Sequence, residues 1–553
     1  MFEKIISALI SFVMFLTSAT GNLFSGSSTA HFTLSLEPNG KTIGNVVSNV
    51  NIWDMGTAFH NPSVNEEYNI YDFVEYIQLM QCSGGTAERD LFIDPLDRTV
   101  LDDYDFSRLI KNCAGIISLG VKPHLKLGGV PLKYTSGVEF GGFDMNIYPP
   151  DDYDVYYNYI KALADALVEE FGKEEVLSWR FGVMTEYENA DWFMAKGGGE
   201  SESATAFCKL YDYTVQALID AIGDDVFVGA HSMTVTEGLW DEAVFIKHAA
   251  QGTNYATGKT GTRVCFLSAS FYDAAPGEYT EGYTLPETIA YLRKTAESYG
   301  LNNLIYGIDE GRILCGNTSG KDSDQLLSRT CGYTYQAAYD ARLWLQCIAN
   351  GIDYFSSWGY LSGGFPDGYP TVSYHVAKLI SQFSGMKMLD ISDKRFLPAS
   401  FGTEVEALAG YDPESGTVRI MAYNFRNKVN YSKSAELKFE IATPGYDGKE
   451  VAVTAYYVND DCNYFDEWCE DRETYGIDDN CFSWSPDDPC LDSLTTLSDP
   501  EAREIYETEL RDKYIECSKL VPVTSTATVT DGALTIEDTI DGNSVVFYEI
   551  TLG

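Results

Sequence analysis

Residues 149–184 read PPDDYDVYYNYIKALADALVEEFGKEEVLSWRFGVM, a segment of helical period followed by a short β-rich run. The two prolines and the acidic residue after them are typical of a helix start. Apolar side chains then recur on one face of a 3.6-residue period, which the run from Ser178 lacks. The segment therefore predicts one helix leading into one strand, the repeating unit of a parallel sheet. The apolar face consists of Ile160, Leu163, Leu167, Val168 and Phe171.

The same alternation extends from Val50 to about Gly385, with eight strand candidates that are each followed by a helix candidate. Eight strands with eight crossovers favour closure into a (β/α)8 TIM barrel over an open sheet. The candidates are VNIWDMG from Val50, TAERDLFI from Thr86, VKPHLKL from Val121, SWRFGVM from Ser178, VFVGA from Val226, VCFLSAS from Val264, LIYGID from Leu304 and IDYFSSW from Ile352.

After Gly385 the helical period fades, and alternating runs such as VRIMAYNF, AELKFEI, VAVTAYYV and SVVFYEI predict a C-terminal β-sandwich domain. We expect a barrel over residues 49–386 and a sandwich over 387–553, interrupted by a cysteine-rich acidic insert at about 459–517. Residues 31–48 are also β-prone, and we expect them to join the sandwich.

The N-terminal segment, residues 1–30, resembles a signal peptide: an apolar stretch from Ile5 to Ala19 precedes small polar residues. We therefore expect a secreted, extracellular protein, with an uncleaved membrane anchor as the alternative. Twelve cysteines in an exported chain favour disulfides over metal ligands. Five of them lie in the acidic insert and predict a loop held by disulfides: Cys462, Cys469, Cys481, Cys490 and Cys517.

The net charge of -44 arises from 38 Lys and Arg against 82 Asp and Glu. Such a surface repels phosphate backbones and anionic membranes, so we expect no nucleic-acid partner. No spacing of His, Cys, Asp or Glu matches a known metal site, and we expect no cofactor.

The prediction of a catalytic activity depends on two glutamates. Glu186 follows the fourth strand candidate and Glu310 follows the seventh, so both should face the mouth of the barrel. Either one alone would be an ordinary solvated loop residue. Together they form the acid and the carboxylate that cleavage of a glycosidic bond requires.

Several stretches resemble glycoside hydrolase family 39, a family of retaining barrel glycosidases in clan A that holds β-xylosidases and α-L-iduronidases. The resemblance covers roughly residues 45–385 and implies double displacement, with Glu310 as nucleophile and Glu186 as acid/base. The stretches are DFSRLIKNCAGIISLGVKPHLKLGGVPLKY from Asp105, the Pro-Pro-x-Asp-Tyr segment at Pro149, the Gly-x-Glu-Glu-Val-x-x-Trp turn at Gly172, FLSASFYD, YGIDEGR and FSSWGYLSGG.

Three positions depart from the family pattern. Thr185 stands where the family has an Asn that contacts the sugar 2-hydroxyl, and a hydroxyl replaces only part of an amide's hydrogen bonding. Ser270 stands in the place of an expected His. Arg312 follows the nucleophile and should lie near the site.

Further side chains are candidates for contact with the sugar, although each also has a structural interpretation. Trp358 offers a flat ring for stacking or for core packing. Tyr272 could hydrogen-bond the nucleophile or simply pack. The remaining polar candidates at strand ends are Arg89, His124, Lys126 and His60.

We therefore predict a retaining glycoside hydrolase acting on oligosaccharides or polysaccharides, most similar to a β-xylosidase. Uronides are an alternative substrate if Arg312, Arg89 and Lys126 converge on one subsite. β-Glucosides and β-galactosides are a second alternative. The alternative from another class is a carbohydrate-binding barrel without catalytic activity.

Overall fold

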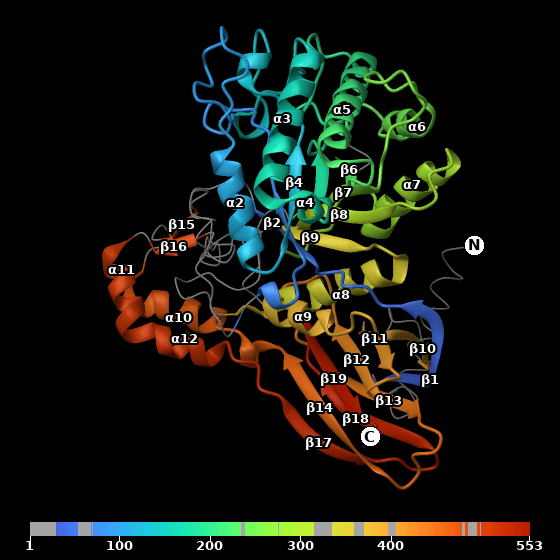
Figure 1. The fold of residues 1–553 in the computed structure, drawn as a ribbon. Coiled ribbons are helices and arrows are strands. Elements are labelled where there is room, and N and C mark those ends of the chain that lie inside the picture. The colour runs from blue at the N-terminus through green and yellow to red at the C-terminus, as the bar shows by residue number, and fades with distance from the viewer. Residues whose placement is uncertain are drawn as a thin grey trace, which may run out of the picture.

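The computed structural model describes residues 29–52, 68, 70–233, 238–274, 276–313, 334–358, 370–395, 405–477, 482–484, 495–497 and 499–552. A barrel surrounded by helices lies above a large twisted sheet (Figure 1).

Eight parallel strands close into the barrel, which confirms the predicted fold class. Closure is made where the first strand pairs with the last, Asn49 beside Ser356. The strands are β2 (Asn49–Ile52), β3 (Tyr76–Leu79), β4 (Lys122–Leu127), β5 (Arg180–Val183), β6 (Val228–Ser232), β7 (Phe266–Asp273), β8 (Ile305–Ile313) and β9 (Tyr354–Trp358).

The prediction for the second strand was wrong. The residues from Thr86 form a loop, and the strand is β3, which lies ten residues nearer the N-terminus. Leu91 and Phe92 make the loop look β-like because both are buried. Phe92 stacks on Tyr159 of the helix α3 (Tyr153–Phe171), with the two ring centroids 5.2 Å apart. Their apolar character therefore serves packing between a loop and a helix.

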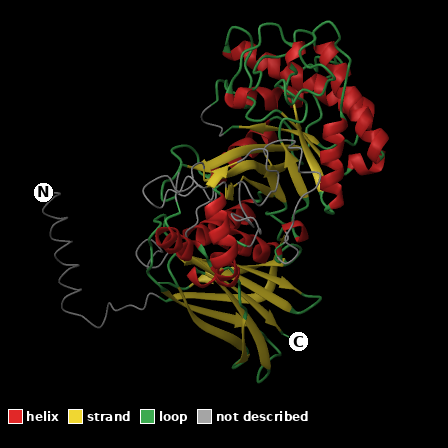
Figure 2. Cartoon of the chain, turned by 90° about the vertical axis from the view of Figure 1, so that its left-hand side faces the viewer, coloured by secondary structure: helices red, strands yellow, loops and turns green. Residues whose placement is uncertain are grey.

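Helices cover the outside of the barrel (Figure 2). The helix expected within residues 149–184 is α3, and the Asp152 carboxylate caps it by accepting from the backbone N–H groups of Asp154 and Val155. Capping satisfies N–H groups that have no partner within the helix. The longer helices are α2 (Ser107–Ser118), α3 (Tyr153–Phe171), α5 (Glu200–Ile222), α6 (Ala243–Gln251), α7 (Leu285–Ser298), α8 (Tyr335–Asn350) and α9 (Val372–Ser381), and α4 (Lys173–Leu177) is one short turn.

The second large sheet has nine strands in the order β17-β14-β19-β12-β11-β10-β1-β13-β18. It curls so that its halves face each other, with the rings of Phe439 and Tyr548 5.9 Å apart across the core. β1 pairs with both β10 and β13, so the N-terminal strand is part of this sheet. The strands are β1 (Ala30–Thr42), β10 (Lys387–Asp393), β11 (Val405–Asp412), β12 (Thr417–Asn424), β13 (Ala435–Ala442), β14 (Glu450–Val458), β17 (Val523–Thr528), β18 (Ala533–Ile540) and β19 (Ser544–Thr551).

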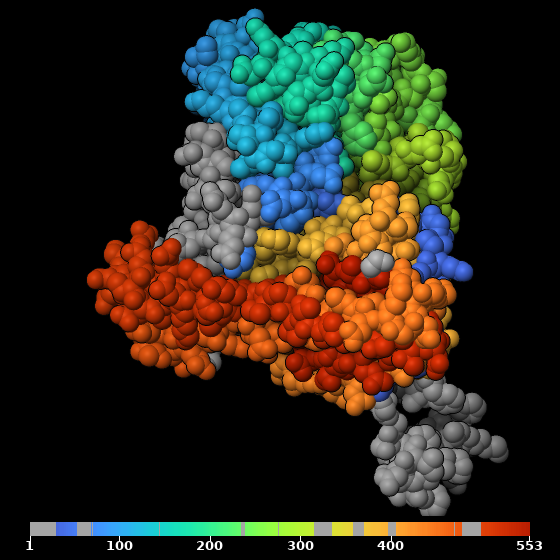
Figure 3. Space-filling view, turned by 60° about the horizontal axis from the view of Figure 1, so that its bottom comes forward, coloured from blue at the N-terminus to red at the C-terminus, as the bar shows by residue number. Residues whose placement is uncertain are grey.

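Between β14 and β17 the chain forms a lobe with its own small core, which includes Trp468, Tyr506 and Tyr514. Figure 3 shows this lobe at one side of the layer formed by the C-terminal part of the chain. Its elements are α10 (Phe465–Tyr475), β15 (Phe482–Trp484), β16 (Thr495–Leu497), α11 (Pro500–Ile505) and α12 (Arg511–Cys517).

The described cysteines do not form the disulfides that we expected, whereas the side chains of Cys469, Cys481 and Cys490 lie outside the described part. Within the described part of the chain, seven cysteines are free thiols: Cys82, Cys113, Cys208, Cys265, Cys347, Cys462 and Cys517. Cys462 and Cys517 belong to the insert; Cys462 is buried in the large hydrophobic core, and Cys517 packs against the aromatic core of the lobe.

α8 and α9 lie between the barrel and the nine-stranded sheet (Figures 1 and 2). Among the described residues, no helix has the length and apolar character that crossing a bilayer requires. Residues 1–28, which make up most of the segment that resembles a signal peptide, lie outside the described residues.

Candidate active site

Glu186 lies on a tight turn just beyond β5, the fourth barrel strand. Its φ is 47° and that of Met184 is 65°, both in the left-handed region that residues other than glycine seldom adopt. The turn is held by the backbone N–H of Tyr187, which donates to the carbonyl of His231 at the end of β6 (3.2 Å). Strained backbone of this kind is frequent where a side chain must be aimed into a site.

The Glu186 carboxylate is fixed at both oxygens. Oε2 accepts from the indole N–H of Trp192 (2.8 Å) and from the amide of Asn189 (3.2 Å). Oε1 accepts from the hydroxyl of Ser270 (2.7 Å). The Asn189 amide cannot turn freely, because its Oδ1 accepts from the backbone N–H of Asp191 (3.0 Å).

Glu310 lies within β8, the seventh barrel strand, and its side chain is buried with 6% exposure. The contact expected with Tyr272 is a hydrogen bond in which the phenol donates to Glu310 Oε2 (3.2 Å). Tyr272 comes from the neighbouring strand β7 and shares a face with Ser270, because side chains alternate along a strand.

One residue connects the two glutamates. Ser270 is the register partner of Glu310 across β7 and β8, and its hydroxyl bonds Glu186. Neighbouring strands lie about 4.8 Å apart, so Glu186 contacts a residue directly beside Glu310. The structure thus brings together the two glutamates that the sequence had placed 124 positions apart.

A β-bulge explains why two consecutive acidic side chains face the barrel interior. The register shifts between Ala269 and Ser270, so that β8 has one residue more than β7 at this point. Asp309 then bonds Ser268 while Glu310 bonds Tyr272, although adjacent residues of a regular strand point to opposite faces. Bulges re-aim side chains in this way next to active sites.

Asp309 anchors the strand beneath Glu310. Its carboxylate is paired with the ammonium of Lys126 and accepts from Ser268 (2.5 Å) and Tyr354 (2.6 Å). Its backbone carbonyl accepts from Asn51 (2.9 Å). Burial alone would raise the pKa of Asp309, but the charge of Lys126 holds that pKa well below its usual range. Asp309 is therefore a buried carboxylate that stays ionised.

Two cations expected to contact the sugar have protein partners instead. Lys126 is 2% exposed and pairs with Asp309. Arg312 is fully buried and pairs with Asp340 (2.6 Å) on α8. A buried charge needs a partner of opposite sign, and these two are already satisfied. Lys126 and Arg312 therefore have different carboxylate partners, and Arg89 lies in the loop after β3.

His124 also differs from the expected sugar contact. It is buried in the barrel, where its ring meets Phe266 and Tyr354 edge-on. Burial holds its pKa well below the ordinary value, so the imidazole is neutral. Its nitrogens have no hydrogen-bond partner among the described residues.

Three further candidates have different outcomes. The Thr185 hydroxyl is buried and lies 3.8 Å from the sulfur of Met80. Trp358 is the last residue of β9, and its side chain lies outside the described part. His60 also lies outside the described residues.

Sequence reasoning missed the residues that hold Glu186. Trp192 and Asn189 follow it in the run ENADWF, where polar and aromatic residues after a catalytic candidate could have drawn attention. His231 was not a candidate at all. Its Nε2 lies 2.8 Å from the Ser270 hydroxyl, directly behind Glu186.

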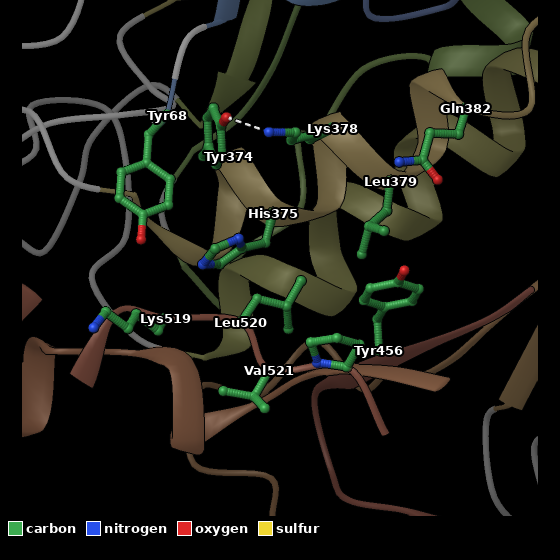
Figure 4. A pocket seen from close by; sticks show the side chains of 11 residues that line it. Tyr68, Tyr374, His375, Lys378, Leu379, Gln382, Tyr456, Lys519, Leu520 and Val521 are labelled. Carbon is green, nitrogen blue, oxygen red and sulfur yellow. Dashed lines mark hydrogen bonds between the residues drawn. The ribbon is translucent and has the colours of Figure 1, made fainter. Parts of the chain in front are cut away.

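A cavity of about 340 Å³ lies elsewhere, between α9 and the nine-stranded sheet. Figure 4 shows Tyr374, His375 and Lys378 of α9 on one side of it and Tyr456 of β14 on the other. Neither glutamate lines this cavity, so it is separate from the candidate active site. Within the described part of the chain, no group of three His, Cys, Asp or Glu side chains could hold a metal ion.

A closed (β/α)8 barrel with glutamates at its fourth and seventh strands defines the class of barrel glycoside hydrolases. The model of the glycosyl hydrolases family 39 matches residues 97–470. The chain therefore belongs to glycosyl hydrolase family 39.

Curated relatives match over a limited stretch. A β-xylosidase of Caldicellulosiruptor saccharolyticus is 31% identical over 121 residues, which are 22% of this chain and 23% of that protein. A β-xylosidase of Geobacillus stearothermophilus is 27% identical over 116 residues, 21% of this chain and 22% of that one. The alignments thus span less than a quarter of these relatives.

Solved structures match over almost the whole chain. A monomeric β-xylosidase from Caulobacter crescentus CB15 has a TM-score of 0.65 at 16% identity, covering 95% of this chain and 99% of that one. A family 39 enzyme from Xanthomonas axonopodis pv. citri has a TM-score of 0.65 at 15% identity, covering 96% and 99%. At these identities the likeness establishes the shared fold.

Proposed function

We propose that the chain hydrolyses glycosidic bonds with retention of configuration, using Glu310 as nucleophile and Glu186 as acid/base. The observation that carries this proposal is Ser270, which bonds Glu186 and is the strand neighbour of Glu310. Double displacement requires two carboxyl groups close enough to act on one anomeric carbon from opposite sides.

The charges around the two glutamates support the division of roles. Burial lowers the pKa of Lys126, and the charges of Asp309 and, more weakly, of Glu310 oppose that lowering, so Glu310 lies within reach of the Lys126 ammonium. A nearby cation favours the ionised form that a nucleophile needs. Burial, the nearby Glu242 and, last, Glu186 raise the pKa of the buried Glu188 carboxyl. Repulsion between Glu186 and Glu188 therefore favours a proton on one of the two, as a general acid requires in its neighbourhood.

In the first step, a Glu310 oxygen forms a bond to the anomeric carbon while the bond from that carbon to the leaving oxygen breaks. Glu186 gives its proton to the leaving oxygen and becomes a carboxylate. The hydrogen bond from Tyr272 fixes the orientation of Glu310 during this attack.

In the second step, Glu186 as carboxylate removes a proton from water, and the hydroxyl oxygen bonds the anomeric carbon as the bond to Glu310 breaks. Trp192, Asn189 and Ser270 all donate toward the Glu186 carboxylate, which stabilises the negative charge that exists between the two steps.

For the substrate we propose a β-xyloside or a similar neutral glycoside. The matched curated relatives are β-xylosidases. The uronide alternative has less support, because Lys126 and Arg312 each have a buried carboxylate partner and offer no free charge to a sugar acid.

The experiment is a panel of aryl β-xylosides, β-glucosides, β-galactosides and uronides, with the anomer formed first read by NMR. We expect hydrolysis of the β-xyloside and a β-anomer as the first product. An α-anomer would exclude double displacement. Binding of xylo-oligosaccharides without turnover of any aryl glycoside would favour the inactive carbohydrate-binding barrel.

A further inference from the structure

A chain of hydrogen bonds runs behind the acid/base glutamate. Ser270 donates to Glu186 Oε1 (2.7 Å), and His231 Nε2 lies 2.8 Å from the same hydroxyl. His231 comes from β6 and Ser270 from β7, so the two neighbouring strands supply one residue each. Both side chains are buried, at 0% and 1% exposure.

We propose that Ser270 and His231 act as a positioning pair that stabilises the carboxylate form of Glu186, the form that activates water in the second step of the reaction. This inference rests on the proposed function. It assigns to His231 a role in the site that neither the family match nor the sequence motifs indicate. It also assigns to Ser270, which stands where a His was expected, the role of hydrogen-bond donor to Glu186.

The direction of these hydrogen bonds follows from the donors around Glu186. Trp192 and Asn189 present only N–H groups to Oε2, so a proton on that oxygen would face two donors. When Glu186 is ionised, Oε1 needs a donor, and the Ser270 hydroxyl supplies it. The Ser270 oxygen then accepts, which requires a proton on His231 Nε2.

The surroundings of His231 keep its imidazole neutral, and the hydrogen bonds of the two ring nitrogens decide which of them carries the proton. Burial, together with the charge of Lys126, lowers the pKa of His231 to about 3, against the opposite influence of Asp309. The ring faces Lys126 on β4, Asp309 on β8, His124 on β4 and the Glu186 turn after β5. A neutral imidazole carries one proton. Nδ1 makes no hydrogen bond among the described residues, and the Asp309 carboxylate lies 3.9 Å from it, whereas the Ser270 hydroxyl lies 2.8 Å from Nε2, within hydrogen-bond distance. The proton therefore belongs on Nε2, where Ser270 accepts it.

The first experiment does not depend on turnover. Nitrogen-15 NMR of protein labelled at its six histidines reports which ring nitrogen of His231 carries the proton. We expect a neutral ring protonated at Nε2, assigned by the loss of its signal in His231→Gln. In Glu186→Gln the side-chain oxygen should face Trp192 and Asn189, so the amide donates to Ser270, which then donates to His231. We expect the proton to move to Nδ1 in that variant.

The second experiment separates the two steps of the reaction. With a dinitrophenyl xyloside, the leaving group departs without acid help and the second step limits turnover. Ser270→Ala and His231→Leu should lower kcat roughly 10- to 100-fold, the range expected for losing a hydrogen bond to a charged group. KM should fall in parallel, and a burst of dinitrophenol should appear as the glycosyl-enzyme accumulates.

Matched variants distinguish this role from a general structural one. His231→Gln keeps an N–H near the position of Nε2, and we expect it to restore kcat to within about threefold of the natural chain. Ser232→Ala removes a buried hydroxyl beside His231 that donates to the backbone carbonyl of Ser268 (3.2 Å). We expect it to leave kcat and KM within about twofold.

The proposal is overturned if the proton of His231 lies on Nδ1 in the natural chain, or if kcat/KM and kcat fall together without a burst. Failure of the proposed function looks different. In that case the natural chain would hydrolyse no glycoside of the panel, while the NMR result would still report on the hydrogen-bonded pair.

Discussion

A buried carboxyl group lies close in the sequence to each of the two glutamates, Asp309 before Glu310 and Glu188 after Glu186, and the two differ in what is buried with them. Asp309 shares the barrel interior with the ammonium of Lys126. Glu188 and Glu242 lie beside each other outside that interior, and in the described residues no lysine or arginine pairs with either. The comparison isolates the effect of one buried cation on a buried acid.

The ionisation of the two buried carboxyl groups is opposite. The pKa of Asp309 is held well below its usual range. Burial and the nearby Glu242 raise the pKa of Glu188 well above its usual range, and burial raises the pKa of Glu242 to about 7. Desolvation penalises the charged form in every case, and only Asp309 has a cation that outweighs it. Burial alone therefore does not predict charge; the partner does.

The difference is consistent with the different tasks proposed for the two glutamates. Glu310 follows Asp309 in the sequence and lies on the cationic side, whereas Glu186 lies two positions before Glu188 on the carboxyl-rich side.

The largest effect should come from removing Glu310, the proposed nucleophile. We expect Glu310→Gly to lower turnover on the order of 10⁵-fold, because no other group can form the covalent intermediate. Added azide should restore part of the rate and yield a glycosyl azide of inverted configuration, since one displacement replaces two. The matched control is Glu188→Gln, which should keep most of the turnover; equal loss in both variants would contradict the assignment.

The next largest effect concerns the cation itself. Lys126→Met leaves Asp309 buried without its partner, and we expect the free energy of unfolding at pH 7 to fall by about 3 to 5 kcal/mol. The deficit should be smaller at pH 4, because an unpaired Asp309 can take up a proton. Urea unfolding measures both values. Lys122→Met, at the exposed start of the same strand, should change stability by less than about 0.5 kcal/mol.

Glu242 should make stability depend on pH in the opposite sense. Its pKa is about 7 in the folded protein against 4.5 ordinarily, so the folded state keeps a proton that the unfolded state releases. The resulting stabilisation is complete below pH 4.5 and is lost as the pH rises through 7, by about 3 kcal/mol.

Glu242→Gln tests this directly, because an amide stays neutral. Relative to the natural chain, we expect the variant to gain up to about 3 kcal/mol in free energy of unfolding between pH 4 and pH 8. The exposed Glu297→Gln should show no such gain. Parallel stability curves for Glu242→Gln and the natural chain would mean that Glu242 is ionised in the fold.

The smallest effect should come from Trp192→Phe, which removes one of the donors to Glu186 Oε2. A hydrogen bond to a charged group contributes about 1.5 to 3 kcal/mol, so kcat should fall roughly 10-fold with a dinitrophenyl substrate. The alkaline limb of the kcat/KM profile should move to higher pH, because the carboxylate form is less stabilised. An unchanged profile would show that Trp192 only packs against the turn.

Much of the fold was readable from the sequence because it depends on local patterns. The helix α3 followed from its apolar face and its acidic start, and the barrel followed from the alternation of elements. The strand predicted from Thr86 was wrong because Leu91 and Phe92 are apolar for packing on α3, a contact between distant segments that no local period reveals. The free thiols of Cys462 and Cys517 likewise reflect spatial neighbours rather than spacing.

The sequence by itself determined that Glu186 and Glu310 belong to the fourth and seventh strand units, whose ends converge on one face of a parallel barrel. Only the tertiary structure decided what surrounds them. The bulge at Asp309, the pairing of Lys126 and Arg312 with buried carboxylates, and the contact of His231 with Ser270 all join segments far apart in the chain. The charge of a buried group depends on such partners, and a partner is a property of the folded chain.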